Sequence, residues 1–169
     1  MNEAINHLRK IVPDSTTETL AIIGAEGYSV LMNQIPRLAK MYSIEESSVE
    51  HLLNRYGSLI DEVLTPGIQD PALLERLAPE LPYLKAEILY AVTHEGALSV
   101  DDVLSRRTRI SFESKDQGLG VVDVVADLIS EALEWGAKER KASIKQYQEI
   151  IERQNELLRQ SKEIKEKVS

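Results

Sequence analysis

The sequence predicts an all-α protein, a compact multi-helix bundle with a long C-terminal helix. Apolar residues recur every three or four positions along most of the chain, which is the period of one helix face. No stretch alternates apolar and polar residues for more than a few positions, so no strand is predicted. The segment 137–169 is rich in charge and carries Ile150, Leu157 and Ile164 at seven-residue spacing, which predicts one long helix.

The N-terminal part of the chain predicts a helix end, a loop and then a new helix. Ile5, Leu8 and Val12 lie on one helical face, and Pro13 breaks the pattern, so residues 1–19 are interpreted as the end of a linking helix and a loop. The next long helix is expected to begin near Ile35, because the following residue is a proline, which is tolerated in the first turn.

Capping signals mark where two of the predicted helices begin. Ser43 with Glu46 three residues later forms a capping box, and the same spacing recurs at Ser99 and Asp102. The helix after Ser43 is expected to bury the apolar side chains that share one face, namely Val49, Leu52, Leu53 and Tyr56.

Between and after these helices the pattern continues to indicate helices joined by short turns. The segment 65–71 is interpreted as a turn that leads into a short helix with Asp70 as its N-cap. A further helix has an apolar stripe that begins at Leu84 and includes Ile88 and Val92. Residues 121–133 are apolar nearly all round, which predicts the most buried helix of the bundle.

Composition and charge limit the classes of function. The 169 residues are 43% hydrophobic and include no cysteine, so a real core is expected and thiol chemistry and cysteine-ligated zinc are excluded. Of the net charge of -8, residues 136–169 hold 9 Lys and Arg against 6 Asp and Glu, whereas the preceding residues hold 11 against 22. An acidic body disfavours a nucleic-acid partner, and no apolar run is long enough to cross a membrane.

Three motifs that could carry chemistry are incomplete. Gly24 and Gly27 follow a short apolar run, but a dinucleotide-binding loop needs a third glycine, so a structural turn is favoured. His7, His51 and His94 have no histidine or carboxylate partners at the spacing of a metal face. No GxSxG segment supports a serine hydrolase. We therefore expect no catalytic, cofactor-binding or metal residue in this chain.

The charges in the stretch "EILYAVTHEGALSVDDVLSRRTRISF" are predicted to be structural. Glu95 follows Leu84 by eleven residues, which at 100° per residue brings it within ~20° of the apolar stripe. Arg107 stands four residues after Val103 and is also expected to face inward. A buried charge is costly unless it is paired, so we expect Glu95 to form a structural ion pair with one of Arg106, Arg107 and Arg109, with Arg107 as the first choice. Loss of that pair would cost roughly 3 kcal/mol.

The neighbouring arginines leave two interpretations open. Arg106 and Arg109 either complement the dipole at the end of a helix or face a partner domain. A DNA-reading helix is disfavoured, because Asp101 and Asp102 lie directly before the arginines.

The same residues carry a resemblance to a known family. "YLKAEILYAVTHEGALSVDDVLSRRTRISF", "AIIGAEGY", "LLNRYGSLIDEVL" and "LISEALEW" occur in order over roughly residues 20–150. This set resembles the C-terminal helical domain of FAD-dependent glycerol-3-phosphate dehydrogenase and of the related α-glycerophosphate oxidase. The chain would then divide into residues 1–19, the family-type domain 20–150 and a helical tail, 151–169.

The resemblance implies a partner, a cofactor and a location. The intact enzyme oxidises glycerol 3-phosphate to dihydroxyacetone phosphate, and its FAD and substrate sites belong to an N-terminal flavoprotein portion on which this domain would pack. The chain alone would be inactive and bind no FAD. It would be cytoplasmic, with the intact enzyme peripheral at the inner face of the membrane, and a homo-oligomer stays open. The alternative is a stand-alone helical protein-interaction module.

Overall fold

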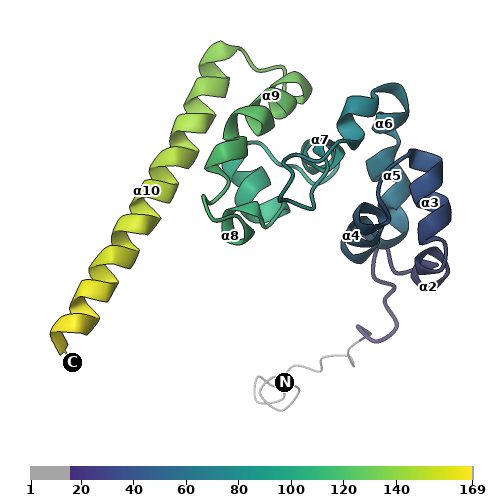
Figure 1. The fold of residues 1–169 in the computed structure, drawn as a ribbon, viewed down its shortest axis with the longest axis horizontal. Coiled ribbons are helices and arrows are strands. Elements are labelled where there is room, and N and C mark those ends of the chain that lie inside the picture. The colour runs from purple at the N-terminus through teal and green to yellow at the C-terminus, as the bar shows by residue number, and fades with distance from the viewer. Residues whose placement is uncertain (1–15, 169) are drawn as a thin grey trace, which may run out of the picture.

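The computed structural model describes residues 16–168, with side chains described for residues 16–161, and confirms the all-α prediction. Figure 1 shows a string of short helices followed by the long helix α10. Within the described range, the extended pairing is a single bridge between Arg76 and Leu84. The predicted helix end containing Ile5, Leu8 and Val12 lies outside the described residues.

The first half of the chain forms a group of short helices around one hydrophobic cluster. These elements are α2 (Tyr28–Met32), α3 (Ile35–Tyr42), α4 (Glu46–Tyr56), η1 (Gly57–Leu59), α5 (Ile60–Leu64), α6 (Pro66–Gln69) and η2 (Pro71–Leu74). The predicted face of α4 is buried, with Leu52 and Val49 fully inaccessible. Pro36 lies in the first turn of α3, as predicted.

Two local predictions in this half are wrong. Ser43 does not cap α4; it adopts a left-handed conformation and ends α3, while Glu45 occupies the N-cap position of α4. The segment predicted as a turn contains the short helix α6. In contrast, Asp70 is confirmed as an N-cap, because its Oδ1 accepts a hydrogen bond from Ala72 N at 3.1 Å. The helix that it caps is one short 3-10 turn.

Helix α7 (Lys85–Thr93) separates two hydrophobic clusters and is buried on opposite faces. Ile88 and Ala91 belong to the cluster formed with the second half of the chain, whereas Ala86 and Tyr90 belong to the first-half cluster. A helix that serves two cores needs apolar residues around most of its circumference. Helix α7 is therefore the shared wall of the domain.

The second half of the chain wraps the other face of α7. It contains η3 (Asp102–Arg107), α8 (Ile110–Glu113), η4 (Leu119–Val121), α9 (Val122–Ala132) and α10 (Ala137–Val168). The capping pair is confirmed, because Asp102 N donates to Ser99 Oγ at 3.1 Å and Ser99 Oγ donates to Asp102 Oδ2 at 2.8 Å. The segment η3 then winds as a π-helix rather than the expected α-helix.

Helix α10 packs through its first half and extends away from the body in its second half (Figure 1). Tyr147 and Ile151 are buried in the second cluster, and Arg140 forms ion pairs with Asp127 and Asp123 of α9. With 32 residues, the helix is roughly 48 Å long. It continues unbroken through residue 150, where the family-type domain was predicted to end, and that boundary stays a prediction.

No helix in the described part of the chain is both long enough and apolar enough to span a membrane.

Candidate functional site

The arginines at the end of η3 lie on or near the surface. Arg106 forms ion pairs with Asp101 and with Asp102, the latter at 3.0 Å, and more than half of its side chain is exposed. Arg109 is more exposed still, and its Nε lies 3.7 Å from Oε1 of Glu113, one turn later in the chain. Both arginines therefore have acidic neighbours within their own segment and remain accessible to a partner.

Arg107 and Glu95 come together, but through a different bond from the predicted one. Arg107 Nε donates to the backbone carbonyl oxygen of Glu95 at 2.8 Å, and Glu95 Oε2 is buried without a hydrogen-bond partner. Two features explain the difference: α7 ends at Thr93, before Glu95, and η3 winds as a π-helix. A constant 100° per residue therefore misplaces both side chains.

Burial of the Glu95 carboxyl raises its pKa, and the nearby guanidinium groups of Arg55 and Arg107 oppose that shift. The carboxyl of Glu87 adds to the shift. Glu95 thus belongs to a cluster of charged residues that also contains Arg55, Glu87 and Arg107.

The centre of that group is Glu87, a residue that the sequence analysis did not single out. Its side chain is fully buried in the first turn of α7, where Oε1 accepts a hydrogen bond from Leu84 N at 2.8 Å. Oε2 lies 3.1 Å from His51 Nε2 and 3.7 Å from Arg55 Nε. The signal for Glu87 was its position three residues after Leu84, on the same inward face.

Two aromatic rings flank the guanidinium of Arg55. Arg55 Nε donates to the Tyr56 hydroxyl at 2.9 Å, and its guanidinium carbon lies 5.3 Å and 5.7 Å from the ring centroids of Tyr56 and Tyr83. Burial, and then the negative charge of Glu87, raise the pKa of Tyr56 well above its usual value, so the hydroxyl stays protonated. The contacts of Glu87 with His51 and Arg55 join α7 to α4.

A hollow of about 320 Å³ opens beside Arg55. Its rim includes Ile22 and Ile23, and its lining includes Tyr28 and Asn54, whose side chains are joined by a hydrogen bond of 2.7 Å. Arg55 is the single charged residue among those that line it.

Two glycines hold one wall of this hollow. Gly24 and Gly57 both have positive φ, and Ser58 N donates to the carbonyl oxygen of Gly24 at 2.9 Å. A Cβ on Gly57 would lie 1.9 Å from that oxygen. The turn predicted at Gly24 is present, because Ala25 N donates to Ile22 O at 3.0 Å, and the close approach of Gly24 to Gly57 is a further feature that was not predicted.

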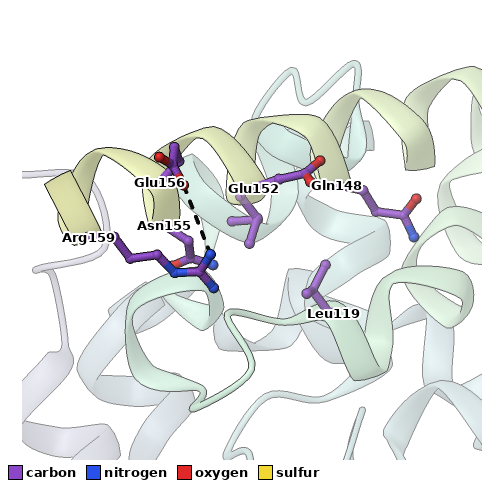
Figure 2. Close-up of a pocket in the computed structure, with 7 residues that line it drawn as sticks. Leu119, Gln148, Glu152, Asn155, Glu156 and Arg159 are labelled. Carbon is purple, nitrogen blue, oxygen red and sulfur yellow. Dashed lines mark ion pairs between the residues drawn. The ribbon is translucent and has the colours of Figure 1, made fainter.

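A second, larger hollow of about 550 Å³ runs along α10 (Figure 2). Its helix side carries polar residues, including Gln148, Glu152 and Asn155, and Leu119 faces them from η4. Asn155 Nδ2 donates to Gln117 Oε1 at 2.8 Å and fixes the helix to the loop before η4. Five of the seven residues that line the groove have amide or charged side chains, and the other two are Leu119 and Ile151.

The two described histidines have carboxylate or aromatic neighbours. Among the residues that the structure describes, no group of three or more histidine and carboxylate side chains could hold a metal ion. His51 is paired with Glu87, and His94 stacks on the ring of Tyr90 with centroids 4.4 Å apart.

The residues present do not fit FAD. A pyrophosphate binds at a glycine-rich turn that joins a strand to a helix. Here the candidate glycines precede α2, which has five residues, and Gly24 is packed against Gly57. No strand occurs in residues 16–168 beyond the isolated bridge.

Comparison with known proteins identifies relatives over most of the chain. Residues 15–140 match the family model described as the C-terminal domain of alpha-glycerophosphate oxidase. A glycerol-3-phosphate dehydrogenase of Mycobacterium leprae is 38% identical over 141 residues, which cover 83% of this chain and 24% of that protein. Glycerol-3-phosphate dehydrogenase 2 of Mycobacterium tuberculosis is 36% identical over 152 residues, covering 90% of this chain and 26% of that protein.

A more distant relative is a mitochondrial glycerol-3-phosphate dehydrogenase of Arabidopsis thaliana, 28% identical over 82% of this chain and 24% of that protein. The chain thus spans about a quarter of the length of the relatives that it matches. No solved structure matches it.

Proposed function

Because this chain belongs to the family of the C-terminal domain of alpha-glycerophosphate oxidase, we propose that it is the non-catalytic helical domain of an FAD-dependent glycerol-3-phosphate dehydrogenase. The intact enzyme would oxidise glycerol 3-phosphate to dihydroxyacetone phosphate and reduce an acceptor. FAD and substrate would bind to the remaining three quarters of the protein. This domain would pack on that flavoprotein portion and stabilise it.

The observation that carries the proposal is that the charged groups described above pair with one another within the domain. Glu87 is paired with His51 and Arg55, and Arg106 is paired with two aspartates of its own segment. The glycines do not form a phosphate cradle, because Gly24 packs against Gly57. These pairings suit a domain that packs against a partner rather than one that carries out a reaction.

Arg106 and Arg109 are our proposed contacts with the flavoprotein portion at the η3 end of the domain. Arg109 is held at its backbone, where its N–H donates to the Tyr83 hydroxyl at 3.1 Å, while its side chain is free to reach outward. The exposed Phe112 lies three residues further along the chain. A guanidinium beside an aromatic ring is a common composition for a protein interface.

The proposed setting of the intact enzyme follows from the family. We place it in the cytoplasm and at the inner face of the cell membrane, with residues 20–150 as the packed domain and 151–169 as its helical tail. No nucleic-acid partner is proposed, because the net charge is -8.

The test combines two measurements on the purified chain. The chain alone should show no flavin absorbance and no glycerol-3-phosphate-dependent reduction of a dye. It should bind the flavoprotein portion of a glycerol-3-phosphate dehydrogenase from the same organism, observed as co-elution in size-exclusion chromatography and as a rise in the thermal stability of the flavoprotein. Bound flavin or activity in the chain alone would overturn the proposal. Failure to bind would favour the stand-alone interaction module.

A further inference from the structure

The segment Leu20–Gly27 presents apolar side chains to solvent although its backbone is held in place. Leu20, Ile22 and Ile23 are 65%, 77% and 85% exposed. The backbone is fixed by the hydrogen bond from Ser58 N to Gly24 O and by a turn in which Ala25 N donates to Ile22 O at 3.0 Å. A held loop with neighbouring exposed large aliphatic side chains is typical of an interaction site.

A polar anchor lies at the base of the same segment. Arg55 lines the same hollow as Ile22 and Ile23, and 23% of its side chain is exposed. Its Nε is used by Tyr56 and faces Glu87, but within the described chain neither Nη nitrogen donates a hydrogen bond. Four N–H groups of a residue that lines the hollow therefore have no acceptor among the described residues.

We propose that this hollow, lined by Ile22, Ile23 and Arg55, is a docking site for an apolar segment of the flavoprotein portion. The inference rests on the proposed function. The matched relatives are about four times longer than this chain, and the family domain begins at residue 15, five residues before Leu20. The additional chain of those relatives therefore joins the domain beside this hollow.

The charges around Arg55 specify the acceptor that the segment should carry. Glu87 lies 3.7 Å from Arg55 Nε, and the carboxyl of Glu95 is close enough for Arg55 to lower its pKa. A third carboxylate would add negative charge beside these two. A neutral acceptor, such as a backbone carbonyl oxygen, fits better, and Arg107 already uses the carbonyl of Glu95 in that way.

The test measures the affinity of the full chain for the flavoprotein portion by titration calorimetry. The double variant Ile22→Ser, Ile23→Ser should bind about a hundredfold more weakly or worse, because it lacks two isoleucine side chains that become buried in the complex. The matched control is Leu157→Ser, Leu158→Ser on α10, where the side chains are 57% and 58% exposed. The control should bind within about threefold of the wild type. Both variants alter exposed positions, so both should keep the helical circular dichroism of the wild type.

The outcomes separate this inference from the proposed function. A wild-type chain that does not bind the flavoprotein portion removes both. A wild-type chain that binds, with an isoleucine variant that binds equally well, overturns the docking site and leaves the proposed function standing. A wild-type chain that dimerises through these isoleucines, with the variant monomeric, would assign the hollow to a second copy and overturn the inference.

Ile23→Asp and Ile23→Lys test the neutral acceptor. Both substitutions remove the same apolar contact, so against a carbonyl oxygen they should weaken binding to a similar extent. Markedly tighter binding by the lysine variant than by the aspartate variant would show that the partner supplies a carboxylate, and this part of the inference would be wrong.

Discussion

Charged side chains occur in two regions of one stretch of sequence, and the fold uses them differently. In the first turn of α7, Glu87 is fully buried and receives contacts from Leu84 N, His51 and Arg55. At the end of η3, Arg106 and Arg109 pair with carboxylates of their own segment and remain largely exposed.

The difference between the regions is one of environment rather than residue type. Removing one member of a buried network leaves charged partners without compensation in a medium of low dielectric constant. Removing one member of an exposed pair returns the other to water at little cost. The buried region should therefore determine stability, and the exposed region should be available for binding.

The largest expected effect is that of Glu87→Ala. The substitution leaves Arg55 and His51 facing an unfilled space and removes the acceptor for Leu84 N, so we expect a loss of about 3–5 kcal/mol in the free energy of unfolding. Urea denaturation at neutral pH measures it. The matched control is Glu113→Ala, an exposed carboxylate near Arg109. Equal stability of the two variants would erase the distinction between the regions.

A smaller loss is expected for Arg107→Ala, which lies between the two regions. Arg107 is half-buried and donates a charged hydrogen bond to the carbonyl oxygen of Glu95. Bonds of this kind contribute about 1.5–3 kcal/mol. The companion Glu95→Ala keeps the carbonyl oxygen, so it should be much less destabilising than Arg107→Ala. Thermal unfolding of both variants tests the order, and a reversed order would favour a carboxylate ion pair instead.

The stability of Glu95→Gln relative to the wild type should depend on pH. The pKa of Glu95 is raised in the folded state, so the native protein binds this proton more tightly than the unfolded chain. The resulting stabilisation is complete below the unfolded pKa of about 4.3 and is lost as the pH rises through the folded pKa. We therefore expect Glu95→Gln to be more stable than the wild type at neutral pH. Denaturation midpoints measured from acid to neutral pH should converge at the acid end; a constant difference would contradict this.

The smallest effect on stability is expected for Arg109→Ala. The pair with Glu113 is exposed and of i,i+4 spacing, so the loss should be below about 0.5 kcal/mol. Affinity for the flavoprotein portion should fall, if Arg109 lies in the proposed contact. A variant that unfolds readily would show that Arg109 has a structural role, and one that binds as well as the wild type would remove it from the interface.

Local rules predicted three features of the helices well, but α9 buries one face rather than its whole circumference, since Val124 is 39% exposed. The stripe on α4, the Ser99 and Asp102 cap and the length of α10 all follow from local rules, in which each residue is related to one three or four positions away. The prediction for Ser43 was wrong because a capping box and a left-handed C-cap compete for the same serine. In the structure Ser43 is the C-cap of α3.

Most contacts of the charged cluster around Glu87 were not predicted, because the residues that meet there are remote in sequence. The contact between His51 and Glu87 spans 36 residues, and no periodicity relates those positions. The approach of Gly24 to Gly57 is equally non-local. Glu95 and Arg107 were expected to meet, but helix ends and π-winding changed which atoms do so.

The sequence by itself determined the all-α class, the long final helix and the family, because these depend on local period and on ordered motifs. Only the tertiary structure decided which charges are buried. Burial depends on which helices pack against α7, and two cores placed on opposite faces of one helix leave Glu87 no route to solvent. The energetic importance of that carboxylate follows from its neighbours in space, which a one-dimensional pattern does not specify.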